Sequence, residues 1–223
     1  MMEILPGIQI RNAVDADIEF IIETIIGAEK GNGDSISYCK LFNINEDEFR
    51  QVLRKIIEAG ISNFEFSLEN FKIAELNGRQ VAAYGAWLEG RDGISSGMLK
   101  SSAFKSYLSK ENIVYYKTAA PFADEISIKR QPGTFQFESI YILEEFRGKN
   151  IGNLLVQSMI DDLKAKYPGV NLAHVQLIKQ NAVSLQAHQK YGFQIIEERT
   201  SMNPQILNFY NGDTRVLMEI KLG

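Results

Sequence analysis

The sequence predicts one α/β domain built on a mixed sheet. From Phe135 onward, segments with the alternating pattern of strands are separated by segments with helical periodicity. Further upstream, Asn77-Gly78 joins two strand-like segments and predicts a tight antiparallel hairpin. With 223 residues and 45% hydrophobic content, the chain can bury a substantial core. No internal repeat or linker divides the sequence, so we expect a single domain over residues 1–223.

The N-terminal half is expected to form a strand, two helices and the hairpin. Gly31-Asn32-Gly33-Asp34 marks a turn between the helices. Asn45 is placed to cap the second helix, and Gly60 is placed to end it. We expect these strands and helices, in chain order, at residues 8–11, 18–26, 46–59, 71–76 and 81–88.

Residues 90–134 are interpreted as an insertion. A helix is expected over 95–108, whereas Pro121, Pro132 and Gly133 predict irregular structure over 115–132. The insertion carries aromatic and acidic side chains that could pack in the core, wall a pocket or form a homodimer contact: Tyr107, Tyr115, Tyr116, Phe122, Asp124 and Glu125.

The C-terminal half shows the clearest alternation of strands and helices. A Pro168-Gly169 turn separates a helix from the strand that follows it. We expect strands at residues 135–142, 172–178, 193–198 and 215–221, and helices at 150–166 and 182–191.

Composition and charge exclude several classes of function. The net charge of -4 gives no electrostatic reason to expect a nucleic-acid partner. Cys39 is the only cysteine, so we expect neither a disulfide nor a metal centre. The sequence has no signal-like leader and no apolar run long enough for a membrane span. We therefore expect a cytoplasmic protein with no membrane partner.

A short loop between a predicted strand and a predicted helix carries the first chemical signal. Arg147-Gly148-Lys149-Asn150-Ile151-Gly152 would present free backbone N–H groups, with the positive end of the helix dipole, to an anion such as a pyrophosphate. The loop has neither the Gly-Lys-Ser/Thr of a P-loop nor a G-x-G-x-x-G fingerprint. Two interpretations stay open here, because the glycines could also serve only a turn and close helix packing.

A second motif lies one strand and one helix downstream. It runs from Asn181 to Phe193 and reads Asn-Ala-Val-Ser-Leu-Gln-Ala-His-Gln-Lys-Tyr-Gly-Phe. Together with the loop, residues 135–199 resemble the cofactor half of the GNAT N-acetyltransferases. The loop of that family reads Arg/Gln-x-x-Gly-x-Gly/Ala, and its next helix begins with Asn and ends in Lys-x-Gly-Phe.

The resemblance implies a fold, a cofactor and a reaction. It implies a mostly antiparallel sheet whose central strands splay apart, flanked by helices. It also implies transfer of the acetyl group of acetyl-CoA to a primary amine, of a small molecule or a peptide, by direct attack in a ternary complex. The acceptor pocket would be formed by residues 27–60 and the insertion. The implied cofactor-binding residues are Ile140, Tyr141, Ile142, Arg147, Gly148, Lys149, Asn150, Ile151, Gly152, Asn181 and Ser184.

Two positions depart from the family pattern. Asn150 stands where the family commonly has Gly, and Asn tolerates unusual backbone angles better than most residues. His188 stands where the family has a Tyr that protonates the departing thiolate. A protonated imidazole could do the same, so His188 is our candidate general acid, with simple packing as the alternative.

Glu138 is the candidate general base that deprotonates the amine. In a regular strand without a bulge it would share a face with Ile140 and Ile142, within reach of the acetyl group. The alternative is a solvated strand residue. Two rival functions also stay open: a noncatalytic acyl-CoA-binding or regulatory module, and a structural protein that uses the insertion as its contact surface.

Overall fold

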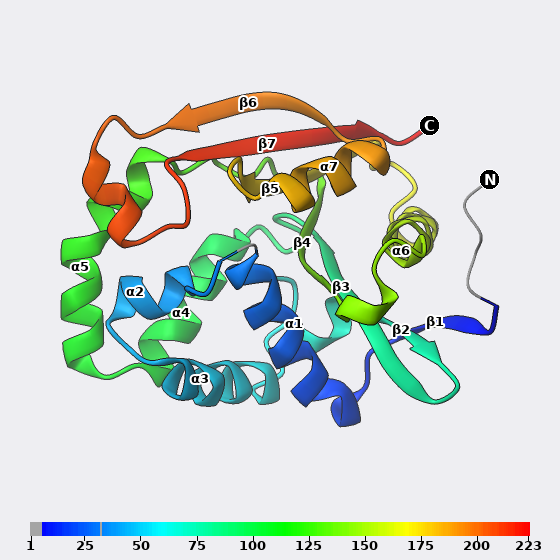
Figure 1. Ribbon diagram of the computed structural model, residues 1–223, viewed down its shortest axis with the longest axis horizontal. Helices are drawn as coiled ribbons and strands as arrows, with labels where there is room; N and C mark the ends of the chain where they lie inside the picture. Colours follow the sequence, from blue (N-terminus) through cyan, green and yellow to red (C-terminus); the bar gives the residue numbers. More distant parts are fainter. Residues whose placement is uncertain (1–5, 32) are drawn as a thin grey trace.

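Seven strands form one sheet in the order β1-β2-β3-β4-β5-β7-β6 (Figure 1). The computed structural model describes residues 6–31 and 33–223. All neighbouring strands run antiparallel except β4 and β5, which confirms the mixed, mostly antiparallel sheet. The strands are β1 (Ile8–Asn12), β2 (Phe71–Leu76), β3 (Arg79–Leu88), β4 (Phe135–Ile142), β5 (Leu172–Ile178), β6 (Gln194–Thr200) and β7 (Thr214–Lys221).

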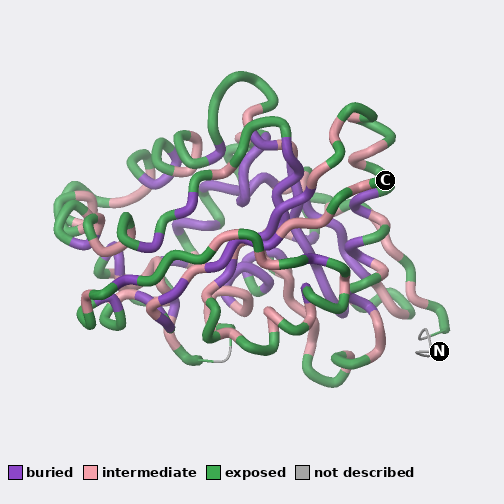
Figure 2. The backbone as a smooth tube through the Cα atoms, turned by 90° about the horizontal axis from the view of Figure 1, so that it is seen from above, coloured by how far each residue is buried: buried purple, intermediate pink, exposed green. Residues whose placement is uncertain are grey.

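Helices cover both faces of the sheet and create two hydrophobic cores. One core joins the sheet to α1 (Ile18–Lys30), α2 (Ser37–Phe42), α3 (Glu46–Glu58), α4 (Ser96–Tyr107) and α5 (Lys110–Glu125). The other joins it to α6 (Ile151–Lys166) and α7 (Ala182–Lys190). The buried backbone runs through the middle of the molecule between these layers (Figure 2). Below, the two sides are called the α1 face and the α6 face.

Local capping and turn chemistry explain two elements that the sequence predicts correctly. The side chain of Asn45 accepts a hydrogen bond from the N–H of Glu48 at 2.9 Å, and the Glu48 carboxylate accepts one from the N–H of Asn45 at 2.8 Å. This capping box fixes the start of α3. Asn77 and Gly78 both have positive φ, as a tight two-residue hairpin between β2 and β3 requires.

Two segments differ from the prediction. No sequence pattern predicts α2, which is short and ends at Asn43 in the left-handed conformation. Helix α5 runs through Pro121, where irregular structure was expected. Pro121 is exposed and costs the helix one backbone hydrogen bond. Stacking of Phe122 on Phe209 and of Tyr116 on Phe42 favours the continuous helix. Asn32, part of the predicted turn, lies outside the described residues.

The parallel pair at the centre of the sheet is short. β4 and β5 are paired only where Phe135 to Phe137 lie beside Ala173 to Val175. Beyond these residues the strands separate, and no strand in the described part of the chain lies beside the β4 edge from Glu138 to Ile142 on the β5 side. The expected splay is therefore present, and it opens the sheet at its centre. Within the described ranges, no helix is long and apolar enough to cross a membrane.

Candidate functional site

A large cavity lies where β4 and β5 separate. Its volume is about 1220 Å³, and its lining comes from α1, α2, α4 and α5 on one side and from β4, β5 and α7 on the other. The aromatic insertion contributes Phe104 and Tyr116 to this wall, and Asp124 lies at its exposed edge. Part of the insertion thus does line a pocket, while Tyr107 and Phe122 pack against the core.

A β-bulge interrupts β4 at the mouth of the splay. Ser139 has a φ of 62, and the register with β3 shifts so that Glu138 faces Gly85 while Tyr141 faces Ala83. A Cβ on Gly85 would lie 3.0 Å from the carbonyl oxygen of Glu138, so a glycine permits this close approach. A bulge leaves its extra residue unpaired in the ladder, so the backbone groups of that residue can bond to another partner.

The bulge also changes the direction of the β4 side chains. Ile140 and Ile142 pack in the α6-face core, whereas Tyr141 contacts Gly27 of α1. Glu138 lies on the α1 face with Arg130. The expectation that Glu138 shares a face with Ile140 and Ile142 is therefore wrong, because it assumed an unbroken alternation.

The loop before α6 has the conformation of an anion-binding loop. Gly148 has a φ of 74, and Asn150, the N-cap of α6, is left-handed with φ 61 and ψ 9. Asn150 thus keeps the conformation that glycine would adopt, as predicted. The N–H groups of Gly148, Lys149 and Asn150 donate to no other residue in the described parts of the chain. They are free to bind an anion at the positive end of α6.

Gly152 packs differently from the expectation for a phosphate-contacting glycine. A Cβ at this position would lie 1.9 Å from the hydroxyl of Tyr191, which rests directly on the helix backbone. Gly152 therefore allows α7 and its following turn to pack against α6. This contact gives the glycine a packing role, whatever else it does.

The structure brings most of the predicted site residues to one cavity. Both candidate catalytic residues, Glu138 and His188, line it. Of the predicted cofactor residues, those lining the cavity are Ile140, Tyr141, Ile142, Arg147, Gly148, Asn181 and Ser184. The others lie further along the loop and the start of α6: Lys149, Asn150, Ile151 and Gly152.

These features fit the shape and chemistry of acetyl-CoA. The unpaired β4 edge can bond an extended pantetheine chain as a further strand would. The free N–H groups of the Gly148 to Asn150 loop can donate hydrogen bonds to the pyrophosphate. At the far side, the Asn181 side chain caps α7 by accepting a hydrogen bond from the Ser184 N–H at 3.2 Å. This cap fixes the wall of the cavity opposite β4.

His188 is buried and engaged at both ring nitrogens. Its Nε2 lies 2.6 Å from the hydroxyl of Tyr84, and its Nδ1 lies 2.8 Å from the carbonyl oxygen of Ser184. A carbonyl only accepts, so Nδ1 carries the proton and Nε2 accepts the Tyr84 hydroxyl. Burial lowers the pKa of His188 to about 4, against a weaker opposing effect of the Ser184 hydrogen bond. The imidazole is therefore neutral at pH 7, and the expectation of a protonated imidazole is not met.

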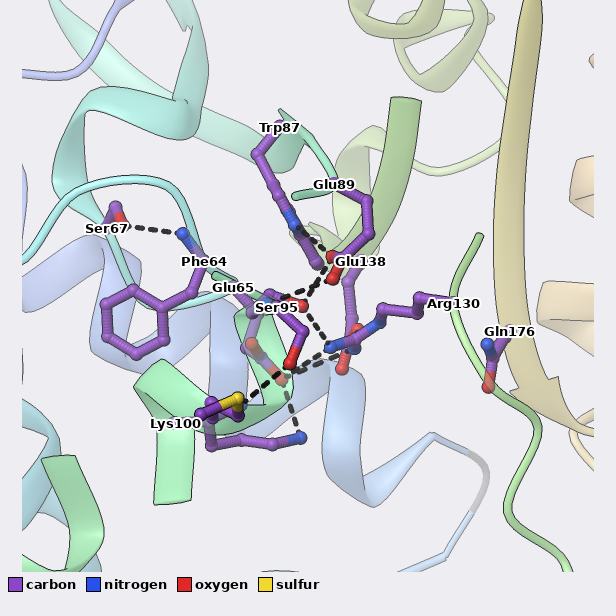
Figure 3. Close-up of polar contacts among 12 residues, drawn as sticks. Phe64, Glu65, Ser67, Trp87, Glu89, Ser95, Lys100, Arg130, Glu138 and Gln176 are labelled. Carbon is purple, nitrogen blue, oxygen red and sulfur yellow. Dashed lines mark hydrogen bonds and ion pairs between the residues drawn. The ribbon is translucent and has the colours of Figure 1, made fainter. Parts of the chain in front are cut away.

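Glu138 belongs to a chain of buried and partly buried charges (Figure 3). Arg130 donates to Glu138 and lies 3.2 Å from Oε1 of Glu65, which also binds Lys100 at 2.6 Å. Arg130 further stacks over the ring of Trp87, 4.9 Å from its centroid. The side chain of Glu65 has no exposed surface, and its pKa is lowered to about 2 because the two cations outweigh the effect of burial. This chain of charges holds Glu138 in one place at the cavity wall.

A second carboxylate, Glu29 of α1, lines the cavity. Its side chain is half-buried in the cavity wall, and no cation lies within 4 Å of it among the described residues. Enclosure raises the pKa of Glu29 to about 7, the charge of Glu138 raises it further, and Arg215 and Lys100 oppose this effect. The sequence analysis missed Glu29, because a glutamate near the end of an amphipathic helix looks like any solvated residue.

Comparison with known proteins agrees with this arrangement. The model of the acetyltransferase (GNAT) family matches residues 48–193, well over half of the chain. No curated protein matches the chain. The chain is similar in fold to an N-acetyltransferase from Staphylococcus aureus Mu50, with a TM-score of 0.61 and 12% identity over 95% of this chain and 100% of that one.

Two further solved structures share the fold. One is a putative acetyltransferase from Salmonella typhimurium with its cofactor acetyl-CoA, with a TM-score of 0.51 and 16% identity over 97% of this chain and 95% of that one. The other is an agmatine N-acetyltransferase mutant, with a TM-score of 0.56 and 13% identity over 97% of this chain and 100% of that one. With the splayed sheet, the loop before α6 and the family match in agreement, the chain belongs to the GNAT family of acetyltransferases.

Proposed function

We propose that the protein transfers the acetyl group of acetyl-CoA to a primary amine, by direct attack while both substrates are bound. The observation that carries this proposal is the unpaired edge of β4, which borders a cavity that also holds two carboxylates. The solved relative from Salmonella typhimurium contains acetyl-CoA, which supports the same donor here. When bound, acetyl-CoA would supply the activated acetyl group as a thioester.

The β4 backbone would hold the donor and stabilise charge. Ile140, Tyr141 and Ile142 would bond the pantetheine arm, and the loop from Arg147 to Asn150 would bind the pyrophosphate. The backbone N–H groups freed by the bulge at Ser139 would face the thioester oxygen, where negative charge develops during attack.

Two carboxylates would prepare the amine. Glu138 lies next to the bulge and is fixed by Arg130, and Glu29 faces the same cavity from α1. An incoming ammonium between them would lose a proton before attack. Glu29 is the better final acceptor, because a pKa near 7 matches a proton acceptor that works at neutral pH. Glu138 would then hold the ammonium and raise the proton affinity of its neighbour.

His188 is proposed to act as a positioning residue. As a neutral, buried acceptor, it fixes the Tyr84 hydroxyl at the cavity wall. The pKa of Tyr84 is raised well above 10 by burial, so Tyr84 is a poor acid for the leaving sulfur. Water would supply that proton.

Two measurements test the proposal. CoA should raise the melting temperature, since a ligand that binds only the folded state at a hundredfold excess over its Kd adds about 2.7 kcal/mol to the free energy of unfolding. Release of CoA from acetyl-CoA should depend on an added amine. CoA binding without turnover of any amine would favour a noncatalytic acyl-CoA-binding module, and the absence of CoA binding would exclude both functions.

A pair of variants at one position tests the loop. Asn150→Gly and Asn150→Asp both tolerate the left-handed backbone, but only Asp adds a negative charge beside the expected pyrophosphate. Asn150→Asp should weaken CoA binding while Asn150→Gly keeps it. Equal affinities would place the pyrophosphate elsewhere.

A further inference from the structure

The cavity holds several cations, and nearly all of them have partners or lie in solvent. Lys100 and Arg130 share the Glu65 carboxylate, and Lys30 pairs with Glu46 at 2.7 Å. Lys105 and Lys129 lie at the exposed rim, where water solvates them. Because these cations are already paired or solvated, they do not indicate a binding site for an anionic ligand.

Arg215 is different. It lies on β7 opposite Ile178 of β5, and its neighbours Val216 and Met218 pack in the α6-face core. Alternation therefore directs Arg215 to the α1 face, where it lines the cavity. The side chain is half-buried, and its guanidinium lies over the ring of Tyr210 at 5.7 Å. In the described part of the chain it has no acidic partner within 4 Å.

A half-buried guanidinium without a carboxylate partner has N–H donors that are free to bind an anionic group. Its planar array of N–H donors matches a carboxylate in a two-bond geometry better than any other side chain does. Tyr210 holds the group from one face and leaves its edge available. The chemistry of Arg215 thus points to an anionic group of a ligand.

Glu29 lines the same cavity. It accepts a hydrogen bond from the Ser37 backbone, but it pairs with no cation among the described residues. The two side chains are near enough for Arg215 to oppose the raised pKa of Glu29, yet they do not form an ion pair. The space between these two opposite charges can therefore hold a small ligand. A ligand with an ammonium and a carboxylate would give each side chain an oppositely charged partner, with its ammonium at Glu29 and its carboxylate at Arg215.

We propose that the amine acceptor is a free amino acid, or a similar small molecule with a primary amine and a carboxylate, and that Arg215 is its carboxylate anchor. This inference rests on the proposed acetyl transfer, because it assigns the acceptor of that reaction. A polyamine would place a second positive charge near Arg215, which disfavours it. A peptide N-terminus has no carboxylate beside its amine, so it would leave Arg215 without a partner.

The test compares amino acids with their amides as acceptors, with acetyl-CoA as donor and CoA release as readout. The amide keeps the size and the amine but removes the negative charge. The preferred amino acid should exceed its amide in kcat/KM by about tenfold to a hundredfold, as expected for charged hydrogen bonds. Arg215→Met should remove this preference. Arg199→Met is the matched control, because Arg199 is the cross-strand neighbour of Arg215 but is exposed and pairs with Glu197.

Binding without turnover separates this inference from the proposed reaction. In the presence of CoA, the preferred amino acid should raise the melting temperature further, and Arg215→Met should abolish that increment while leaving the effect of CoA. If amides or simple amines serve as well as amino acids, or if Arg215→Met weakens CoA itself, the carboxylate anchor is wrong. If amino acids bind in this way but no amine is acetylated, the anchor stands and the proposed reaction fails.

Discussion

The hydroxyl of Tyr84 donates to Nε2 of His188 across 2.6 Å, joining β3 to α7 under the floor of the cavity. The Ser184 carbonyl occupies the other ring nitrogen, so the neutral imidazole is satisfied at both ends. A protonated ring could keep both contacts, because the tyrosine oxygen also accepts, but burial would make its positive charge costly. The pair is therefore adapted to a neutral histidine.

The first prediction concerns the pH dependence of stability. The pKa of His188 is about 4 when folded and about 6.5 when unfolded, so the unfolded chain binds more protons between these values. This contribution to stability is present above pH 6.5 and is lost as the pH falls through 4, by about 3 kcal/mol. Glu29 has the opposite sign, because its folded pKa is raised. Urea unfolding of wild type and His188→Gln isolates the histidine, since Glu29 is common to both. Parallel stability curves from pH 7.5 to pH 4 would contradict the neutral histidine.

The second prediction concerns the pH dependence of acetyl transfer. If Glu29 accepts the proton, kcat/KM should rise with pH through about 7, because only the carboxylate form acts. Glu138→Gln removes the like charge that helps raise the pKa of Glu29, and it also frees Arg130. Both changes favour ionisation, so the rise should move to lower pH. Glu29→Gln should remove it. A profile that is unchanged in Glu29→Gln but lost in Glu138→Gln would make Glu138 the base.

The third prediction concerns the contact between α1 and β4. A Cβ on Gly27 would lie 2.4 Å from the Tyr141 ring, so Gly27→Ala must displace either the helix or the ring. We expect a loss of about 1–3 kcal/mol in the free energy of unfolding. Gly97→Ala in α4 is the control, because its Cβ would meet no atom within 4 Å. That variant should gain up to about 1 kcal/mol from helix propensity. Equal effects of the two substitutions on the free energy of unfolding would show that the space between Gly27 and Tyr141 can accept a Cβ.

The fourth prediction concerns the buried carboxylate at the centre of the charge network. Glu65→Gln leaves Lys100 and Arg130 without their shared negative charge. Breaking such a buried pair typically costs about 3–5 kcal/mol. Glu145→Gln is the control, because it removes an exposed pair with Arg79, which water screens and which should contribute little to stability. Similar losses in the two variants, measured by urea unfolding, would contradict a central role for Glu65.

Much of the fold follows from patterns that are local in the sequence. Asn45 with Glu48, Asn77 with Gly78, and the left-handed Asn150 each act through their own backbone, so a short window of sequence suffices to predict them. The bulge at Ser139 depends on the register with β3, in particular on Gly85 opposite it. No pattern within β4 predicts the bulge. The predicted direction of the Glu138 side chain is wrong for that reason.

The candidate site likewise combines residues that the sequence predicts with residues that it does not. His188 could be found from motif position and Glu138 from strand alternation, but the pKa of His188 depends on burial, to which residues far away in the sequence such as Tyr84 contribute. Glu29 and Arg215 have no motif at all. They become notable only when folding places opposite charges in one cavity without pairing them.

The brief ladder between β4 and β5 has a mechanical consequence. Strands β1 to β4 form one leaf of the sheet and β5 to β7 form another. Among the residues that the structure describes, only the segment from Phe135 to Phe137 joins the two leaves by backbone hydrogen bonds. A donor molecule laid along the open edge of β4 would bridge the leaves and stiffen the whole sheet. The bound cosubstrate would then make the sheet more rigid. The sheet would be more flexible at the moment when the product must leave.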